Sequence, residues 1–368
     1  MKRIIAQARK ELTQIFRDRL TLVFALVMPL FLLALLGSAI SLDVKDLPIV
    51  VQDLDQTPQS RQYLETLQGS ITFRVVPLSP TEHPEDALLE GRARGAVIIP
   101  KNFDRELRRG AEAEVQWLID GADANTANIM KGNSVAVSQA FMARIRPVPA
   151  TPAVRAQMRF WYNPGRESDK YIGPGMFAVG LALFPPLLAA LAMSREGEQK
   201  TILQVYVSSI SAHEFLLGKI FAFMVIGLAE WALSLALSFW MFKLKIAGDP
   251  TPFLVNTFLY LFCNVCFGAM IGAVIPNQAA AIQATQIAGF LLSFLLSGFI
   301  FPVSNIPIGV RWVADLVPAR YYIEVVRDAF VRGAGWPAVW HAPLVLTALG
   351  LAFFSIAWLR MRRMQVEA

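Results

Sequence analysis

The sequence predicts a membrane α-helical bundle of six transmembrane helices, with the N- and C-termini in the cytosol and an inserted α/β domain on the external, periplasmic side. Hydrophobic residues make up 55% of the 368 positions and charged residues only 17%, and the mean hydropathy is +0.46. The apolar residues form runs of about 20, the length a helix needs to cross a bilayer. Residues 41–170 lack such runs, which predicts the inserted domain.

Residues 1–19 are expected to form an amphipathic helix at the membrane surface. Basic side chains alternate with apolar ones at helical spacing, which is typical of a helix lying on an anionic lipid surface. A charged cytosolic tail is the alternative. The predicted apolar positions are Ile4, Ile5, Ala8, Leu12, Ile15 and Phe16.

Residues 20–40 are the first predicted transmembrane helix. A cleaved signal peptide is the alternative, because positive charge precedes the apolar run and small residues follow it. The run is longer than a usual signal-peptide core of about 7–15 residues, which favours a retained anchor. Six basic residues before it place the N-terminus in the cytosol.

Residues 41–170 alternate short β-like runs with amphipathic segments, the pattern of a small α/β domain. Two aspartate pairs, Asp53/Asp55 and Asp120/Asp123, are expected to be turn residues. A proline-rich hinge at 146–152 returns the chain to the membrane. The predicted strands are 48–51, 71–76, 95–99 and 115–119, and the predicted helices are 59–67, 84–91, 102–110 and 125–145.

Residues 171–368 are expected to supply transmembrane helices 2–6. Pro302 and Pro307 divide the long uncharged run from 278 to 310, so the fifth helix should end near Phe301 and an external re-entrant segment should cover 301–335. Basic residues after the last span place the C-terminus in the cytosol. The predicted spans are 171–194, 220–242, 251–275, 278 to about 301, and 333–359.

The cytosolic loop at 195–219 is a charged island between two apolar runs. Ile202, Tyr206 and Ile210 recur at helical spacing. A short amphipathic helix between two spans lies at the membrane surface or against another protein. We interpret this loop as the place where a partner applies force.

Motifs for catalysis, metal binding or nucleotide binding are missing from the sequence. It contains no G-x-x-x-x-G-K-[ST] loop and no H-E-x-x-H, and its three histidines are widely separated. Cys263 and Cys266 form a C-x-x-C inside an apolar helix, where buried small residues are the better interpretation. The basic excess at the chain ends is a topology signal rather than a nucleic-acid site. We expect no catalytic site, cofactor or metal in this chain.

Glu230 is the most informative single residue, because a charged side chain in mid-membrane costs roughly 2.5–3.5 kcal/mol. It could contact a substrate or proton, meet a subunit interface, or hold helices together as a hydrogen-bonded acid. Asn264, Gln283 and Gln286 are polar residues on neighbouring spans, and they fit helix–helix hydrogen bonds or a translocation path.

Three stretches resemble the ABC-2 type permeases of ATP-driven exporters, in particular the bacterial drug-efflux branch with a large external domain between spans one and two. They are REGEQKT (195–201) with LLGK (216–219), LSGFIFPVSNIP (296–307) and PARYYIEVVRDAFVRGAG (318–335). The external stretches VVQDLD (50–55) and AVIIPKNF (96–103) are similar to that branch as well. The resemblance covers nearly the whole chain.

This resemblance implies a permease in the bacterial inner membrane that dimerises with a second copy or a paralogue and couples to separate ATPase subunits, which bind the ATP and Mg. It would move hydrophobic or amphipathic small molecules outward, and a periplasmic adaptor could dock on the external domain. ATPase coupling would fall to Glu196, Glu198, Thr201, Ile202 and Tyr206. The external gate candidates are Phe301, Pro302, Pro307 and Arg327.

Three alternatives stay open at this point. Export of a lipid-linked or polysaccharide substrate is the nearest. A membrane-anchored sensor or assembly factor would not require five further spans. An intramembrane enzyme would need paired catalytic residues at membrane depth, and only Glu230 is present there.

Overall fold

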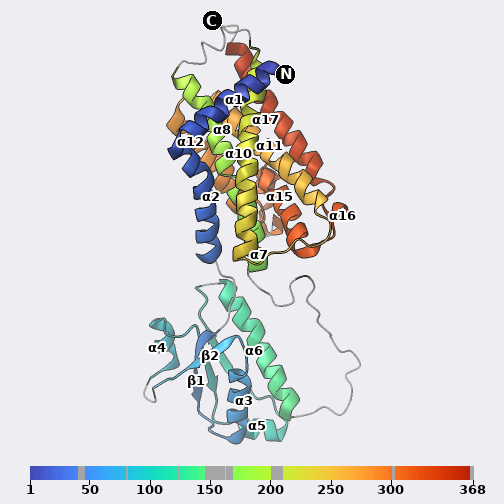
Figure 1. The fold of residues 1–368 in the computed structure, drawn as a ribbon. Helices are drawn as coiled ribbons and strands as arrows, with labels where there is room; N and C mark the ends of the chain where they lie inside the picture. Colours follow the sequence, from blue (N-terminus) through green and yellow to red (C-terminus); the bar gives the residue numbers. More distant parts are fainter. Residues whose placement is uncertain are drawn as a thin grey trace. The chain divides into compact units, whose positions relative to one another are not determined.

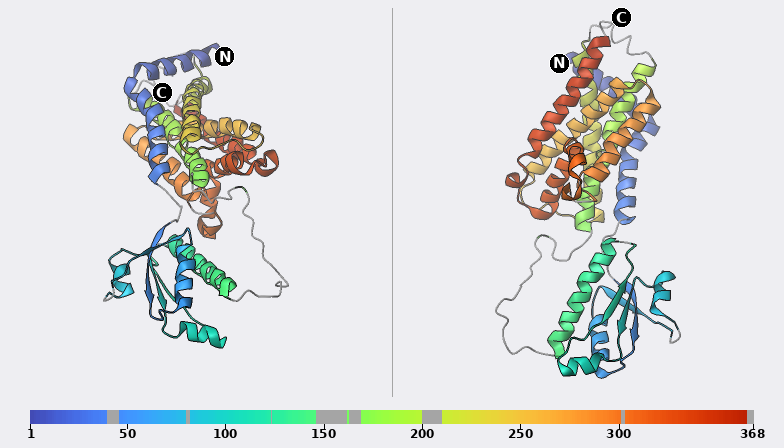
Figure 2. Two further views of the ribbon diagram at one scale, coloured as in Figure 1. Left: turned by 60° about the horizontal axis from the view of Figure 1, so that its bottom comes forward. Right: turned by 180° about the vertical axis from the view of Figure 1, so that it is seen from behind.

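The computed structural model describes residues 1–39, 46–79, 82–122, 124–145, 162, 169–199, 210–300 and 303–364. The chain divides into two compact units, one formed by Met1–Ser41 with Phe160–Ala368 and one formed by Leu42–Arg159. Figures 1 and 2 show the elements of each unit.

A four-stranded sheet forms the centre of the Leu42–Arg159 unit, in the order β2-β1-β3-β4. β1 pairs in parallel with β2 and β3, and β4 pairs antiparallel with β3 at the edge. Each run predicted as a strand overlaps one of them. The strands are β1 (Leu47–Asp53), β2 (Phe73–Val76), β3 (Gly95–Ile99) and β4 (Gln116–Ile119).

Helices cover both faces of this sheet, because successive strand residues point to opposite sides. Ile49 belongs to a core with residues of α3, α5 and α6, whereas its neighbour Val50 packs with Ala87 of α4. Figure 1 shows α3 and α6 close together. The helices are α3 (Pro58–Gln68), α4 (Pro84–Leu89), α5 (Phe103–Arg109) and α6 (Ala124–Ile145).

The aspartates of this unit act as turn residues. Asp53 accepts hydrogen bonds from the backbone amides of Asp55 and Gln56. Asp120 accepts one from the amide of Ala122. Asp123 lies outside the described residues.

The other unit is a helical bundle. Among the described residues, six helical runs are long and apolar enough to cross a membrane: Arg19–Ser38, Lys170–Glu198, Ala212–Met241, Thr251–Val274, Gln278–Leu296 and Ala342–Arg362. Its longer helices are α1 (Lys2–Arg17), α2 (Arg19–Ala39), α7 (Asp169–Gly180), α8 (Phe184–Glu198), α10 (Ala212–Met241), α11 (Thr251–Val274) and α17 (Ala342–Met364). The shorter ones are α12 (Gln278–Thr285), the π-helix η1 (Gln286–Leu291), α13 (Leu292–Leu296), the 3-10 helix η2 (Val303–Asn305), α14 (Ile308–Asp315), α15 (Pro318–Arg327), the π-helix η3 (Asp328–Arg332) and α16 (Trp336–Val339).

The described part of the second span is broken between α7 and α8. Pro185 and Pro186 lie in the first turn of α8 and have no backbone N–H, so the carbonyls of Leu181 and Ala182 lose their helical donors. Asn264 of α11 donates to the Leu181 carbonyl over 3.4 Å. A neighbouring helix therefore satisfies a backbone group that the break exposes.

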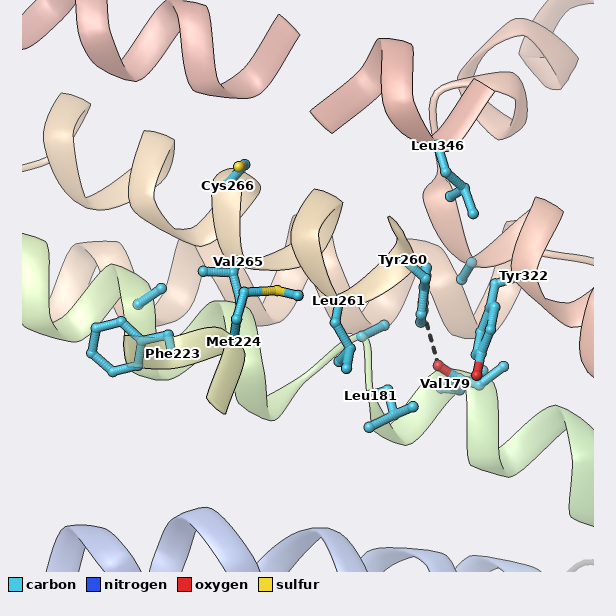
Figure 3. Close-up of a cluster of buried hydrophobic side chains, with 14 of the residues drawn as sticks. Val179, Leu181, Phe223, Met224, Tyr260, Leu261, Val265, Cys266, Tyr322 and Leu346 are labelled. Atoms are coloured by element: carbon cyan, nitrogen blue, oxygen red, sulfur yellow. Dashed lines mark hydrogen bonds between the residues drawn. The ribbon is translucent and has the colours of Figure 1, made fainter. Parts of the chain in front are cut away.

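α11 packs tightly against α8 through glycines. A side chain on Gly268 would meet the carbonyl of Pro186, and one on Gly272 would meet the carbonyl of Ala190. Small residues let membrane helices approach closely and gain van der Waals contact. Figure 3 shows the core beside these helices, with Tyr260 of α11 against Tyr322 of α15.

The largest errors in the predicted span boundaries are at the starts of the third and last spans, and the fifth span ends at Leu296 rather than near 301. The third span begins at Ala212 rather than 220, because Ser211 and Glu214 form a capping box that starts α10 eight residues earlier. The last span begins at Ala342 rather than 333. Gly333 and Gly335 have positive φ, and Asp328 accepts hydrogen bonds from the amides of Ala334 and Gly335, so this stretch is a turn.

α1 is amphipathic, but its buried face differs from the predicted one. Ala8, Glu11 and Ile15 are buried, whereas Ile5 is 61% exposed and Phe16 59% exposed. α1 crosses the end of the bundle at which α17 also ends (Figures 1 and 2). A charged residue therefore occupies the centre of the face that packs on the bundle.

Candidate functional site

A buried ion cluster joins three helices that are far apart in the sequence. Lys219 of α10 is only 1% exposed, and its Nζ donates to Glu11 Oε1 of α1 at 2.9 Å. The same Nζ lies 3.2 Å from Glu196 Oε1 of α8 and 3.4 Å from the carbonyl of Ala192. Lys10 Nζ lies 3.1 Å from Glu196 Oε1. We call Lys10, Glu11, Glu196 and Lys219 the buried ion cluster.

Gly218 explains how α1 reaches Lys219. A Cβ at this position would lie 3.0 Å from the carbonyl oxygen of Ile4 and even closer to the Gln7 side chain. The absence of a side chain lets α1 lie directly on α10, and the next residue then reaches Glu11. The Gly-Lys pair thus combines a close helix crossing with a buried charge.

The energetics of the buried ion cluster make its helices mutually dependent. An ammonium group has three donors, and here two carboxylates and one carbonyl lie within reach of them. Removing one partner of such a buried pair costs about 3–5 kcal/mol, because the other charge is left uncompensated. α1, α8 and α10 cannot separate at this point without breaking these contacts.

α10 is long enough to place Lys219 at its surface end. Thirty residues span about 45 Å, whereas the hydrocarbon core is about 30 Å thick. Glu214, in the first turn, accepts from the Ser211 amide at 3.1 Å and lies 3.6 Å from Arg3 of α1. A second ionic contact thus ties α1 to the same end of α10.

The residues predicted to contact an ATPase are only partly described. Glu196 belongs to the buried ion cluster, and Glu198 Oε2 accepts from the backbone amide of Gln278 at 2.9 Å, at the start of α12. Thr201, Ile202 and Tyr206 lie outside the described residues. Both described glutamates therefore make contacts within the chain.

Asp18 joins α1 to α2. It accepts hydrogen bonds from the Thr21 amide at 3.1 Å and the Thr21 hydroxyl at 2.6 Å. These bonds, and then the positive charge of Arg195, hold the pKa of the Asp18 carboxyl below its usual value.

Glu230 is 0% exposed, and neither of its carboxylate oxygens has a hydrogen-bond partner among the described residues. One helical turn earlier, Gly227 faces Pro185 at the start of α8 and Leu261 of α11. Glu230 thus occupies the α10 side of the bundle interior, one turn beyond the residue that faces the start of α8. The structure gives this acid no counter-charge among the residues it describes.

The other polar candidates in the membrane divide into two groups. Asn264 is buried and bonded to the broken second span. Gln283 and Gln286 are exposed on the surface of the fifth span. Cys263 and Cys266 are buried free thiols within α11, and no metal-binding group was found among the described residues.

At the opposite end of the bundle, Arg327 of α15 holds the chain that follows the fifth span. Its guanidinium donates to the carbonyl of Gly298 at 3.0 Å and to that of Phe299 at 3.3 Å, and it lies 4.3 Å from the centre of the Tyr171 ring. The Tyr171 hydroxyl donates to the same Phe299 carbonyl at 2.9 Å. Burial lowers the pKa of the Arg327 guanidinium below its usual value, although the nearby Tyr171 acts to raise it. We call Arg327 with Tyr171 the external clamp.

Among the described residues, the structure shows no contact between Arg327 and the other gate candidates. Pro307 is exposed and precedes α14. Phe301 and Pro302 lie outside the described residues.

Sequence reasoning missed Glu11, Lys219 and Tyr171 as site residues. One signal was present for Glu11, since it is the only acidic residue in the otherwise basic helix α1 and lies on the same face as Ala8 and Ile15. Lys219 was noticed only as part of the Gly-Lys pair. Tyr171 carried no distinguishing local signal.

Comparison with known proteins identifies the family to which the chain is similar. A model of the family described as "ABC-2 family transporter protein" matches residues 19–359. The chain is 28% identical over 366 residues to "Probable multidrug ABC transporter permease YbhS" of Escherichia coli (strain K12), covering 98% of this chain and 97% of that protein. It is 24% identical to "Probable multidrug ABC transporter permease YbhR" of the same organism, covering 96% and 97%. It is 27% identical over 326 residues to its "Inner membrane transport permease YhhJ", covering 86% and 85%.

Proposed function

This chain belongs to the ABC-2 family of transporter proteins, and we propose from that membership that it is the permease subunit of an ATP-driven exporter, in the bacterial inner membrane. Its sequence has no P-loop, so ATP and Mg would be bound by separate ATPase subunits. The positive charge at both chain ends supports a cytosolic location for them. The Leu42–Arg159 unit would then lie in the periplasm, where an adaptor protein could bind it.

The buried ion cluster is the observation that best supports ATPase coupling at the cytosolic end. A force applied to the chain between α8 and α10 would act on Glu196 at one end and Lys219 at the other. Because these residues contact each other and Lys219 also contacts Glu11, the displacement would pass to α1, α8 and α10 together. In this proposal Thr201, Ile202 and Tyr206 would contact the ATPase, and Glu196 and Glu198 would transmit the displacement.

Co-purification with the cognate ATPase tests this proposal. Ile202→Asp/Tyr206→Asp should abolish ATPase binding while the protein stays folded in the membrane. Leu89→Asp, at an exposed position on α4, is the matched control and should bind normally. Glu196→Arg is a poor probe, because it would place a second cation against Lys219. Normal binding and ATP turnover by the double variant would contradict the coupling site.

The proposed cargo is a hydrophobic or amphipathic small molecule. Two relatives are named as multidrug permeases, and the described spans offer mostly apolar walls with isolated polar groups such as Glu230 and Asn264. Export of a lipid-linked or polysaccharide substrate is the alternative. Drug-stimulated ATP turnover in vesicles should be seen with the permease–ATPase complex, and its absence across a panel of amphipathic drugs would favour the alternative.

Gln283 and Gln286 support dimerisation with a second copy or paralogue. Their amides are exposed on the surface of a membrane span, where contact with lipid would leave polar groups without partners. A facing subunit or a wet pathway between two subunits would satisfy them. Cysteine cross-linking in membranes should capture Gln286→Cys as a dimer, whereas Leu344→Cys on the exposed side of α17 should stay monomeric.

The external clamp supports a gate at the far end. Arg327 fixes the position of the chain directly before Phe301 and Pro302 by bonding two consecutive carbonyls. In this proposal Phe301, Pro302 and Pro307 form the moving part of the exit, and Arg327 with Tyr171 forms its fixed anchor.

A further inference from the structure

A basic groove runs along α1 and meets the buried ion cluster at Lys10. Its volume is about 940 Å³, and five basic side chains line it against one acidic side chain. Arg9, Arg17 and Arg195 make no ion pair with any described residue, so their charges are available to a ligand. The basic lining consists of Lys2, Arg9, Lys10, Arg17 and Arg195.

The groove adjoins a cavity between α1, α8 and α10 that is lined by polar and charged side chains and by one set of apolar side chains. This cavity has a volume of about 500 Å³, and Lys10, Gln14, Asp18 and Arg195 line both spaces. Its other walls include the buried ion cluster and a set of apolar side chains. The apolar set is Ile15, Leu188, Leu191, Ala192, Ile210 and Phe223.

Two features favour a lipid over an acidic protein surface as the occupant. A basic groove beside a cavity with an apolar wall matches a molecule with an anionic head and a hydrocarbon tail, whereas an acidic protein surface would use only the groove. Ile5, which lines the groove, and Phe16 are exposed large apolar residues on α1, and the first membrane span begins at Arg19. The groove therefore lies where a span enters the membrane.

We propose that this groove binds the phosphate-bearing headgroup of an anionic phospholipid of the cytosolic leaflet, with an acyl chain against the apolar wall of the adjoining cavity. The proposal rests on the cytosolic location of α1 in the proposed function. Arg9, Arg17 and Arg195 would hold the phosphate from two helices, α1 and α8. Lys10 lines the groove and also contacts Glu196, so headgroup binding would act directly on the buried ion cluster.

Native mass spectrometry of the purified full-length chain tests the site without any ATPase. The chain is reconstituted with phosphatidylglycerol in a phosphatidylcholine background, and retained phosphatidylglycerol is counted. We expect tight retention by the wild type and about 30-fold weaker retention by Arg9→Gln/Arg17→Gln, since each basic residue near a membrane surface contributes about 1 kcal/mol, which is about fivefold in affinity. Arg195→Gln, on the α8 wall, should weaken retention independently of any change in α1.

The matched control is Arg360→Gln/Arg362→Gln, which removes two exposed arginines from the end of α17. Equal loss in the control would mean general attraction of basic residues to lipid and would overturn the site. Unchanged retention in both groove variants would overturn it too, as would displacement of the lipid by millimolar inorganic phosphate. A groove variant that keeps its lipid but loses ATPase binding would show a protein interface instead. Because lipid retention is measured on the chain alone, a failure of ATPase coupling leaves this test intact.

Discussion

Replacing Lys219 with methionine gives the sharpest test of the buried ion cluster. Methionine keeps most of the side-chain volume and removes the charge, so the change leaves the carboxylates of Glu11 and Glu196 facing each other. Glu11 is 4% exposed, and both carboxylates lie within 3.2 Å of the ammonium in the wild type. Removing one partner of a buried ion pair costs about 3–5 kcal/mol, and we expect Lys219→Met at the lower end of that range, because Lys10 still lies 3.1 Å from Glu196 and 3.9 Å from Glu11.

Glu11→Gln should cost much less, although it alters the same contact. The glutamine amide oxygen still accepts from Lys219, and Glu196 remains as its counter-charge at 3.2 Å. The loss is the difference between a charged and a neutral hydrogen bond, about 1–1.5 kcal/mol. In the double variant the carboxylate repulsion is absent and Lys10 still neutralises Glu196. The double variant should therefore be less destabilised than the sum of the single variants, by about 1–3 kcal/mol.

Urea unfolding in detergent, followed by tryptophan fluorescence, measures these free energies in a double-mutant cycle. Lys245→Met is the control, because Lys245 is exposed and should change stability by less than 0.5 kcal/mol, roughly the size of ordinary surface substitutions. The reasoning is refuted if Lys219→Met costs no more than Glu11→Gln, or if the two changes are additive.

Three further predictions concern other parts of the bundle. Arg327→Met should destabilise the protein by about 2–4 kcal/mol in the same unfolding assay, and Tyr171→Phe by only about 1 kcal/mol. The arginine supplies two charged hydrogen bonds, whereas the tyrosine supplies one neutral hydrogen bond. Equal effects of the two substitutions would contradict the external clamp. Gly268→Ala should lower the unfolding midpoint by forcing α11 away from a backbone carbonyl, whereas Gly132→Ala in α6, with open space around it, should leave it unchanged or raise it. The stability difference between wild type and Asp18→Asn should be constant from pH 5 to pH 8 and shrink below about pH 4. The pKa of Asp18 is lowered in the folded state, so its contribution to the free energy of unfolding is complete above the unfolded-state pKa and is lost as the pH falls through the folded-state pKa. A difference that grows on acidification would contradict this prediction.

The elements that the sequence predicted well are those with a strong local period. The described residues contain six helical runs that are long and apolar enough to cross a membrane, as predicted, and the membership of the ABC-2 family is confirmed. The strand β3 has the predicted bounds, 95–99, because a central strand that is buried on both faces is a continuous apolar run with clear ends. A repeat of apolar residues every 2 or 3.6 positions involves only residues that are close in the sequence, so a single sequence suffices to detect it.

Helix ends were predicted less well, because the apolar run and the capping residues begin at different positions. α10 starts at Ala212, where Ser211 and Glu214 form a capping box, and not at 220, where the apolar run begins. The last span starts at Ala342 because Gly333 and Gly335 turn the chain first. Polar residues at a helix terminus extend the helix beyond the membrane, and a search for apolar runs cannot detect that extension.

The buried ion cluster was beyond sequence reasoning because Lys10 and Glu11 are about two hundred positions away from Glu196 and Lys219. Glu11 and Lys219 are separated by 208 residues, and no local spacing relates them. Burial cost drew attention to Glu230, which stands in mid-membrane within an apolar run. The same argument missed Lys219, since that residue lies at the edge of its apolar run and could have remained in water.

Glu196 and Glu198 were predicted to face an ATPase, and their contacts within the chain suggest a more specific division of roles. Glu196 reaches Lys219 and, through it, α1 and α10, while Glu198 receives the first amide of α12, which begins the fifth span. A displacement at the end of α8 would therefore act on three spans and the surface helix without requiring either glutamate to touch the partner. On the proposed function, the loop after α8 receives the force and these two carboxylates distribute it. Substitutions of Glu196 or Glu198 should then uncouple transport from ATP turnover while leaving ATPase binding intact, whereas substitutions of Ile202 and Tyr206 should abolish binding itself.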